Sequence, residues 1–295
     1  MTDETSPAPT IRICEVGPRD GLQNEPARLS VEQKVEFIER LAASGLAEIE
    51  VGSFVRPDVI PQMADSGAVL RGVQRMPGVL YSALVPNLKG LELALDAGVD
   101  KVAVFTSATE GFAQSNIRST IADSINRFRD VVSHAHRAGV SVRGYVSCVI
   151  ECPYDGPTDP EQVRRVCDSL LEIGVDELDL GDTIGVATPD SISRLYEGLA
   201  PTCAPGESVL HLHDTNGRAL ECAERAIELG VDRFDASCAG LGGCPFAPGA
   251  SGNLATEELA SCLEEGGSTT GLDIAGLRAA GTYIRGCLAR ADSRS

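Results

Sequence analysis

A unit of one strand followed by one helix recurs along this chain, and this repetition limits the possible folds more than any other feature. Each expected strand is a short apolar run, and several of the helices that follow end at a glycine. Three similar tetrapeptides join a helix to the next strand: Ala-Gly-Val-Asp at 97–100, Ile-Gly-Val-Asp at 173–176 and Leu-Gly-Val-Asp at 229–232. Such short turns are typical of the lower end of an α/β barrel.

Eight of these units occupy 295 residues, which is about the length that a (β/α)8 barrel requires. The expected strands lie at residues 10–16, 47–51, 79–84, 101–105, 140–147, 177–180, 209–213 and 233–237. The expected helices lie at 31–44, 62–74, 88–97, 160–173, 218–229 and 272–289, with others that begin at 119, 189 and 256. A doubly wound sheet also alternates strands with helices, but it rarely sustains eight evenly spaced units.

We therefore predict one α/β domain, a single (β/α)8 TIM barrel over residues 10–290, preceded by a flexible tail at 1–9. No linker interrupts the series of units. A glycine-rich loop follows the eighth strand, and an extra helix lies at the C-terminal end. We expect the glycine-rich loop to border the active site, because the loops that follow the strands form the active sites of such barrels.

The composition argues against several classes of partner. The chain has 25 basic and 43 acidic residues, a formal charge of −18, which disfavours nucleic acid and anionic membranes as partners. An anionic substrate would therefore need a local basic pocket. The N-terminus lacks the apolar segment of a secretory signal, no apolar run is long enough to span a bilayer, and the ten cysteines form no CxxC pair. We expect a soluble cytoplasmic protein with free thiols.

The four histidines form two His-x-His pairs with opposite geometry. His211 and His213 lie in an expected strand, where residues two apart point to the same face, so both imidazoles enter one space. His134 and His136 lie in an expected helix, where residues two apart are separated by about 200° around the axis, and we expect them at the surface. The strand pair could be two core histidines, but neutral imidazole is also the commonest metal ligand.

Polar residues gather where the expected strands end, and this favours a metal site over two core histidines. They are Arg19 and Asp20 after the first strand, Glu50 and Ser53 at the second, and Asp182 and Thr183 after the sixth. Asp20 would add a carboxylate ligand, although a simple ion pair with Arg19 is the alternative. Carboxylate, imidazole and amide ligands together suit Mg²⁺ or Mn²⁺, with Zn²⁺ as a further alternative.

The loop at 240–257 is the other informative stretch. Its five glycines and two prolines are the composition of a lid with a defined path and mobile ends. It carries one thiol, Cys244, and one amide, Asn253, shortly before an expected helix. A plain flexible loop that ends in a helix-capping asparagine would have similar residues.

Three motifs carry a family resemblance: Glu-Val-Gly-Pro-Arg-Asp-Gly-Leu-Gln-Asn-Glu at 15–25, His-Leu-His-Asp-Thr at 211–215 and the glycine-rich loop at 240–257. Shorter matches lie at 53–55, 61–65, 86–90 and 144–148. With these motifs, residues 10–265 of the chain resemble the 3-hydroxy-3-methylglutaryl-CoA (HMG-CoA) lyases. That family consists of divalent-metal TIM barrels and is related to the isopropylmalate and homocitrate synthases.

The resemblance implies a role for each matching residue. The implied ligands of the divalent metal, Mg²⁺ or Mn²⁺, are Asp20, His211, His213 and Asn253. The implied catalytic residues are Arg19, Cys244, His211 and Glu50, with Glu257 in support. The implied substrate-binding residues are Arg19, Gln23, Ser53, Asp182 and Thr183.

The reaction implied by the resemblance is the retro-Claisen cleavage of HMG-CoA to acetyl-CoA and acetoacetate. Arg19 would stabilise the thioester oxygen as its charge develops, and Cys244 would move a proton. The base that accepts the hydroxyl proton stays open between His211, Asp20 and a metal-bound hydroxide. We further expect an acyl-CoA substrate as the partner and a homodimer or a higher homo-oligomer.

Three alternatives remain at the level of the sequence: a lyase for a larger branched 3-hydroxyacyl-CoA, a Claisen-type synthase that joins acetyl-CoA to a 2-oxo acid, and a non-catalytic barrel that binds acyl-CoA or a protein. The chain departs from the family pattern at Ala187, where glycine is usual, at Asn216, where tyrosine or arginine is usual, and in the segment 116–120. These positions are expected near the barrel mouth, so they leave the identity of the acyl group open.

Overall fold

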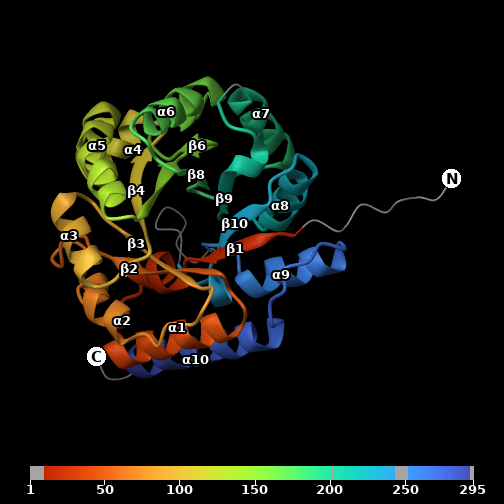
Figure 1. Ribbon diagram of the computed structural model, residues 1–295. Helices are drawn as coiled ribbons and strands as arrows, with labels where there is room; N and C mark the ends of the chain where they lie inside the picture. The colour runs from red at the N-terminus through yellow and green to blue at the C-terminus, as the bar shows by residue number, and fades with distance from the viewer. Residues whose placement is uncertain (1–9, 201, 243–251, 293–295) are drawn as a thin grey trace.

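Eight parallel strands close into a barrel, in the order β1-β10-β9-β8-β5-β4-β3-β2 (Figure 1). The computed structural model describes residues 10–200, 202–242 and 252–292. The barrel strands are β1 (Arg12–Glu15), β2 (Glu48–Ser53), β3 (Leu80–Leu84), β4 (Lys101–Ser107), β5 (Ser141–Ser147), β8 (Glu177–Asp182), β9 (Ser208–Leu212) and β10 (Arg233–Ala236). The predicted (β/α)8 fold class is confirmed; the tail predicted at 1–9 lies outside the described residues.

Helices surround the barrel and alternate with its strands (Figure 1). They are α1 (Val31–Ala43), α2 (Ser66–Gly72), α3 (Leu88–Asp96), α4 (Glu110–Ile117), α5 (Ile121–Arg137), α6 (Pro160–Glu172), α7 (Pro189–Leu199), α8 (Ala219–Glu228) and α9 (Thr256–Glu265). The extra C-terminal helix is α10 (Ile274–Asp292), which runs alongside α1, and its Tyr283 hydroxyl donates to Glu36 of α1 at 3.0 Å. None of the described helices is both long enough and apolar enough to cross a membrane.

The local sequence explains where several helices begin and end. Ser30 caps α1, because its hydroxyl accepts the N–H of Gln33 while the Gln33 side chain accepts the N–H of Ser30. The glycines of the three repeated tetrapeptides, Gly98, Gly174 and Gly230, have φ angles of 84°, 93° and 101°. This left-handed region strains residues that carry a Cβ, so the repeated tetrapeptides do form helix-ending turns, as predicted.

Three features near the carboxyl ends of the strands differ from the prediction. The expected helix at 62–74 is divided into a 3₁₀ turn at Pro61–Met63 and α2. Helix α4 is not predicted, because its buried side chains, Phe112 and Ala113, are adjacent and give no helical stripe. After β5 the chain forms a short hairpin of β6 (Glu151–Cys152) and β7 (Gly156–Pro157), which contains too few residues for a periodic pattern.

Paired charges fill part of the barrel interior. Arg143 of β5 contacts carboxylates from three other strands: Glu177 at 2.7 Å, Asp235 at 2.9 Å and Glu48 at 3.2 Å. The Lys101 ammonium of β4 also contacts Glu177. A buried charge is tolerated when it is paired and hydrogen-bonded, whereas removal of one partner is costly. The network therefore ties β2, β4, β5, β8 and β10 together below the site described next.

Candidate metal and substrate site

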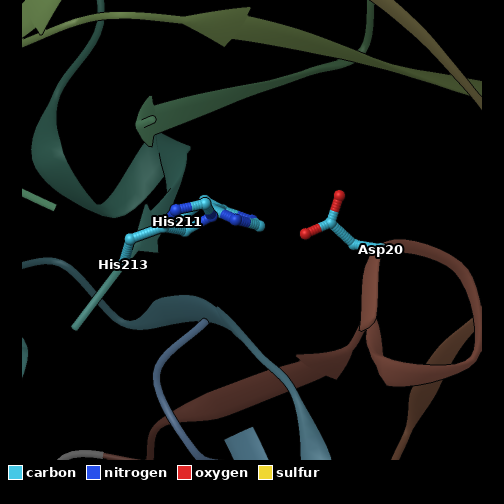
Figure 2. A group of neighbouring side chains, drawn as sticks. All are labelled: Asp20, His211 and His213. Atoms are coloured by element: carbon cyan, nitrogen blue, oxygen red, sulfur yellow. The ribbon is translucent and has the colours of Figure 1, made fainter. Parts of the chain in front are cut away.

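Asp20, His211 and His213 form a cluster at the carboxyl end of the barrel. One carboxylate oxygen of Asp20 and one nitrogen of each imidazole all lie within 4.8 Å of one another. Figure 2 shows the Asp20 carboxylate facing the two imidazoles from the opposite side. His211 is the fourth residue of β9 and His213 follows its end, so the strand alternation that predicted one shared space is confirmed.

A tight turn after β1 places Asp20 in this cluster. Residues Gly17–Gly21 form a single π-helical turn in which the N–H groups of Arg19, Asp20 and Gly21 all point to the Val16 carbonyl, at 3.1, 2.7 and 3.2 Å. Short π-helical segments are rare and occur frequently at functional sites.

Glu15 links this turn to the segment that follows β10, the strand paired with β1. Its buried carboxylate accepts the N–H of Gly17 at 2.7 Å, the N–H of Cys238 at 2.8 Å and the hydroxyl of Thr256 at 2.7 Å. Burial nevertheless dominates and raises the pKa of Glu15 to about 7. A single buried side chain thus joins the loop after β1 to the loop after β10.

Asn253 lies beside the cluster and presents an amide oxygen with no hydrogen bond. The residue forms an isolated bridge with His213, and its Nδ2 donates to Asp20 at 2.8 Å and to the Leu241 carbonyl at 3.0 Å. Among the described residues, the buried Oδ1 of Asn253 and the buried Nδ1 of His213 have no hydrogen-bond partner. Unpaired buried polar atoms are costly, and an oxygen and nitrogen set of this kind fits a hard divalent cation.

Two of the three titratable candidate ligands, Asp20 and His213, have pKa values shifted toward the protonation state that binds a cation. Burial opposes the charged form of Asp20, but the charges of Arg19 and the two imidazoles outweigh it and lower its pKa. Burial, helped by the neighbouring charge of His211, lowers the pKa of His213 to about 4. Burial acts in the same direction on His211, yet its hydrogen bond to Asp235 reverses the effect and raises its pKa.

Arg19 is buried between two carboxylates at the edge of the cluster. Its Nε donates to Glu50 of β2 and its Nη1 donates to Asp20. The guanidinium lies over the Tyr145 ring, 5.1 Å from the centroid, and the Tyr145 hydroxyl lies 3.2 Å from both Glu50 and Asp235, which share its single proton. These contacts fix the plane of the guanidinium, which a flexible surface arginine does not achieve.

A cavity of about 440 Å³ opens beside these side chains. Seven of the residues predicted from the sequence line it: Arg19, Asp20, Gln23, Ser53, Thr183, His211 and His213. Glu50 and Asn253 are buried beside the cluster and touch its members without lining the cavity. The structure therefore brings together most of the predicted site.

Asp182 does not face the cavity. Its carboxylate accepts the N–H groups of Val186 and Ala187, at 3.2 and 2.9 Å, and so shapes the loop after β8. Burial raises its pKa to about 6. Glu257 has a comparable role, because its carboxylate accepts the N–H of Ala239 at 2.9 Å.

The sequence patterns indicate neither the apolar wall of the cavity nor the roles of two polar residues behind His211. The wall is formed by Val55, Val59, Ile60, Leu84, Phe105, Phe112 and Tyr154. The polar residues are Asp235, which accepts a hydrogen bond from Arg143, and Tyr145, whose ring lies under the Arg143 guanidinium. The only signal for Asp235 is a charged residue within an expected apolar strand, which could have drawn attention to it.

The other histidines and the cysteines take positions away from this chemistry. His134 and His136 are exposed on α5, as expected, where they contact the Asp130 carbonyl and the Asp176 carboxylate. All nine described cysteines have free thiols; eight are buried and Cys262 is partly exposed. Cys244, predicted to be catalytic, lies outside the described residues.

A family model described as HMGL-like matches residues 10–284 of the chain. The chain belongs to the HMGL-like family. A relative from Pseudomonas aeruginosa, named 3-hydroxy-3-isohexenylglutaryl-CoA/hydroxy-methylglutaryl-CoA lyase, is 47% identical over 282 residues, covering 96% of this chain and 94% of the relative. Two other relatives of this HMGL-like chain, each 45% identical, are named as a cytoplasmic lyase of Rattus norvegicus and a mitochondrial lyase of Macaca fascicularis.

Solved structures of HMGL-like proteins match the barrel closely. The HMG-CoA lyase of Brucella melitensis has a TM-score of 0.93 and 47% identity, and covers 95% of this chain and 99% of its own. An HMG-CoA lyase from Acinetobacter baumannii, solved in complex with coenzyme A and 3-methylmalate, has a TM-score of 0.90 and 35% identity, covering 95% and 92%. None of the residues that depart from the family pattern lines the cavity; the segment 116–120 reaches it only through Asn116, which matches that pattern.

Proposed function

We propose that this protein cleaves HMG-CoA to acetyl-CoA and acetoacetate, with a divalent metal held by Asp20, His211, His213 and Asn253. The observation that carries the proposal is the convergence of one carboxylate, two imidazoles and an unpaired amide oxygen beside a buried arginine in one cavity. The names of the relatives support the substrate, and the coenzyme A complex of one relative supports an acyl-CoA ligand. A bound Mg²⁺ or Mn²⁺ would act as a Lewis acid that lowers the pKa of the substrate's tertiary hydroxyl.

Arg19 has the role of stabilising the thioester oxygen. Cleavage of the C–C bond moves an electron pair onto the thioester as an enolate, so negative charge grows on that oxygen. Glu50 and Asp20 accept from the Nε and Nη1 of Arg19. Its Nη2 has no acceptor among the described residues and can donate to the substrate. A preorganised donor stabilises developing charge more strongly than a mobile, solvated one.

Of the two side chains predicted as the base that takes the hydroxyl proton, Asp20 and His211, we favour Asp20, because a His211 ring that donates its Nδ1–H to Asp235 and gives Nε2 to the metal has no lone pair left to accept a proton. Both line the cavity and both belong to the ligand cluster. Protonation of the enolate carbon then completes the reaction, for which Cys244 remains our prediction.

Ser53 is the best placed of the other predicted substrate-binding residues. Its buried hydroxyl oxygen has no hydrogen-bond partner among the described residues, and the residue lines the cavity. Gln23 is partly engaged, since its Nε2 donates to Asp20 at 2.8 Å. Thr183 is also engaged, since its hydroxyl accepts the N–H of Cys148 at 2.8 Å. We therefore propose that Ser53 contacts the acyl group directly, whereas Gln23 acts chiefly on Asp20.

The apolar wall favours a second candidate activity on larger 3-alkyl groups. Val55, Leu84, Phe105 and Phe112 offer more apolar surface than one methyl group can cover, and a relative is named for an isohexenyl substrate. Comparing kcat/KM for HMG-CoA and 3-hydroxy-3-isohexenylglutaryl-CoA tests this. We expect Val55→Phe to reduce turnover of the larger ester more than that of HMG-CoA; an equal loss on both would count against the wall as the alkyl site.

A coupled assay for acetoacetate with and without EDTA tests the main proposal. We expect activity to vanish with EDTA and to return with Mg²⁺ or Mn²⁺; full activity in excess chelator would refute the metal-dependent mechanism. We also propose that the protein acts in the cytoplasm, which the nine free thiols support. Our prediction of a homodimer or higher oligomer is open to light scattering.

A further inference from the structure

Asp235 and His211 occupy paired positions on neighbouring strands. The register of β9 and β10 places Asp235 opposite His211, and paired residues of adjacent strands point to the same face. Both side chains therefore enter the barrel interior, where Asp235 is only 1% exposed. The His211 Nδ1 lies 3.1 Å from the Asp235 Oδ2, a hydrogen-bond distance.

The Asp235 carboxylate is held in place by donors on both oxygens. Its Oδ1 accepts from Arg143 at 2.9 Å, and its Oδ2 lies 3.2 Å from the Tyr145 hydroxyl, whose single proton it shares with Glu50. Arg143 is in turn anchored by Glu177 at 2.7 Å. An ionised carboxylate can only accept hydrogen bonds, so the proton shared with His211 must be carried by Nδ1.

These contacts leave one ring nitrogen of His211 free, and that nitrogen is Nε2. We propose that Asp235 is a positioning residue, which fixes the ring orientation and the Nδ1–H tautomer of His211 so that Nε2 serves as a metal ligand. Carboxylates that accept from a ligand histidine in this way also increase its basicity. The inference rests on the metal site proposed above and extends it to a residue that does not line the cavity.

Two observations separate this role from simple charge pairing. His213, the other imidazole of the cluster, has no such carboxylate, and its buried Nδ1 lacks a partner among the described residues. Asp179, His211 and Asp235 also lie within ligand distance of one another, but Arg143 contacts both carboxylates, at 3.4 and 2.9 Å. Because that arginine already supplies the compensating positive charge, the inner group is a hydrogen-bonded support and the ligand cluster lies on the Asp20 side.

The first test compares Asp235→Asn with Glu177→Gln as a matched control. Both substitutions remove one carboxylate that contacts Arg143, but of the two carboxylates only Asp235 reaches His211. An asparagine can present its NH₂ group to Nδ1, which selects the wrong tautomer. We expect Mn²⁺ affinity, measured by titration of the purified chelator-stripped proteins, to fall about 10- to 100-fold in Asp235→Asn and to stay unchanged in Glu177→Gln.

If Asp235 served only as a counter-ion for Arg143, both variants would lose thermal stability and both would keep their Mn²⁺ affinity. A folded Asp235→Asn protein with wild-type Mn²⁺ affinity would therefore overturn the inference. Absence of Mn²⁺ binding by the wild-type protein would instead refute the proposed metal site, so the two failures are distinguishable.

The second test needs no variant of Asp235 and so remains decisive if that variant does not fold. Only four histidines are present, so ¹⁵N-histidine labelling gives few imidazole signals, and His134→Gln and His136→Gln assign the surface pair. We expect His211 in mildly alkaline solution with Mg²⁺ to carry its proton on Nδ1. A proton on Nε2 of His211 would overturn the inference.

Discussion

Replacement of Arg19 by lysine tests the central step of the proposed mechanism. The arginine is 6% exposed, its Nε and Nη1 are held by Glu50 and Asp20, and Nη2 remains for the substrate. Lysine keeps the charge, but its single ammonium cannot hold two carboxylates in the same plane and also reach the thioester oxygen.

The expected loss follows from the geometry. Removal of one preorganised donor from a developing oxyanion costs about 2.7–4 kcal/mol, or roughly 10²- to 10³-fold in rate. We expect Arg19→Lys to lower kcat by this factor while KM changes only a few-fold, since the interaction forms mainly in the transition state. Arg164→Lys is the control, because Arg164 pairs with Glu161 and Asp168 on the outer helix α6, far from the cavity.

The assay is acetoacetate formation across a metal titration. If Arg19 served only to neutralise Asp20 and Glu50, the variant would bind the metal differently and saturating metal would repair its turnover. Recovery of wild-type kcat at saturating Mg²⁺ or Mn²⁺ would refute the catalytic role of Arg19.

Three further predictions follow from the structure. We expect His213→Ala to lose bound metal and turnover together while His134→Ala, at the surface, keeps both; full metal occupancy in the first variant by elemental analysis would contradict the site. The pKa of Glu15 is raised from 4.5 to about 7, so the folded protein should lose about 3 kcal/mol relative to Glu15→Gln as the pH rises from about 4.5 through about 7, and a pH-independent difference in urea unfolding would refute this. Brief iodoacetamide treatment should modify Cys262 before the eight buried thiols, as mass mapping would show, although partial burial and then its glutamate neighbours raise its pKa and slow its reaction. Cys244, in the loop outside the described residues, is the thiol we expect to react fastest.

Local rules determined the barrel and part of the site from the sequence. The repeated glycines specify helix ends because only glycine adopts their backbone angles without strain, and eight repeats of one unit leave few architectures. The shared space of His211 and His213 is equally local, because it depends only on strand alternation. Asp20 could be assigned to the same site as the two histidines, because the carboxyl ends of all the parallel strands lie on the same side of a barrel.

Only the tertiary structure decided how these side chains are supported. Asp182 and Thr183 are neighbours in sequence, yet one shapes a loop and the other lines the cavity. The contact between Asp235 and His211 depends on the register of β9 against β10, and the contact between Arg19 and Glu50 depends on the π-helical turn after β1. Register and barrel closure are set by the packing of the whole sheet, so no local pattern reveals which buried charges meet across it.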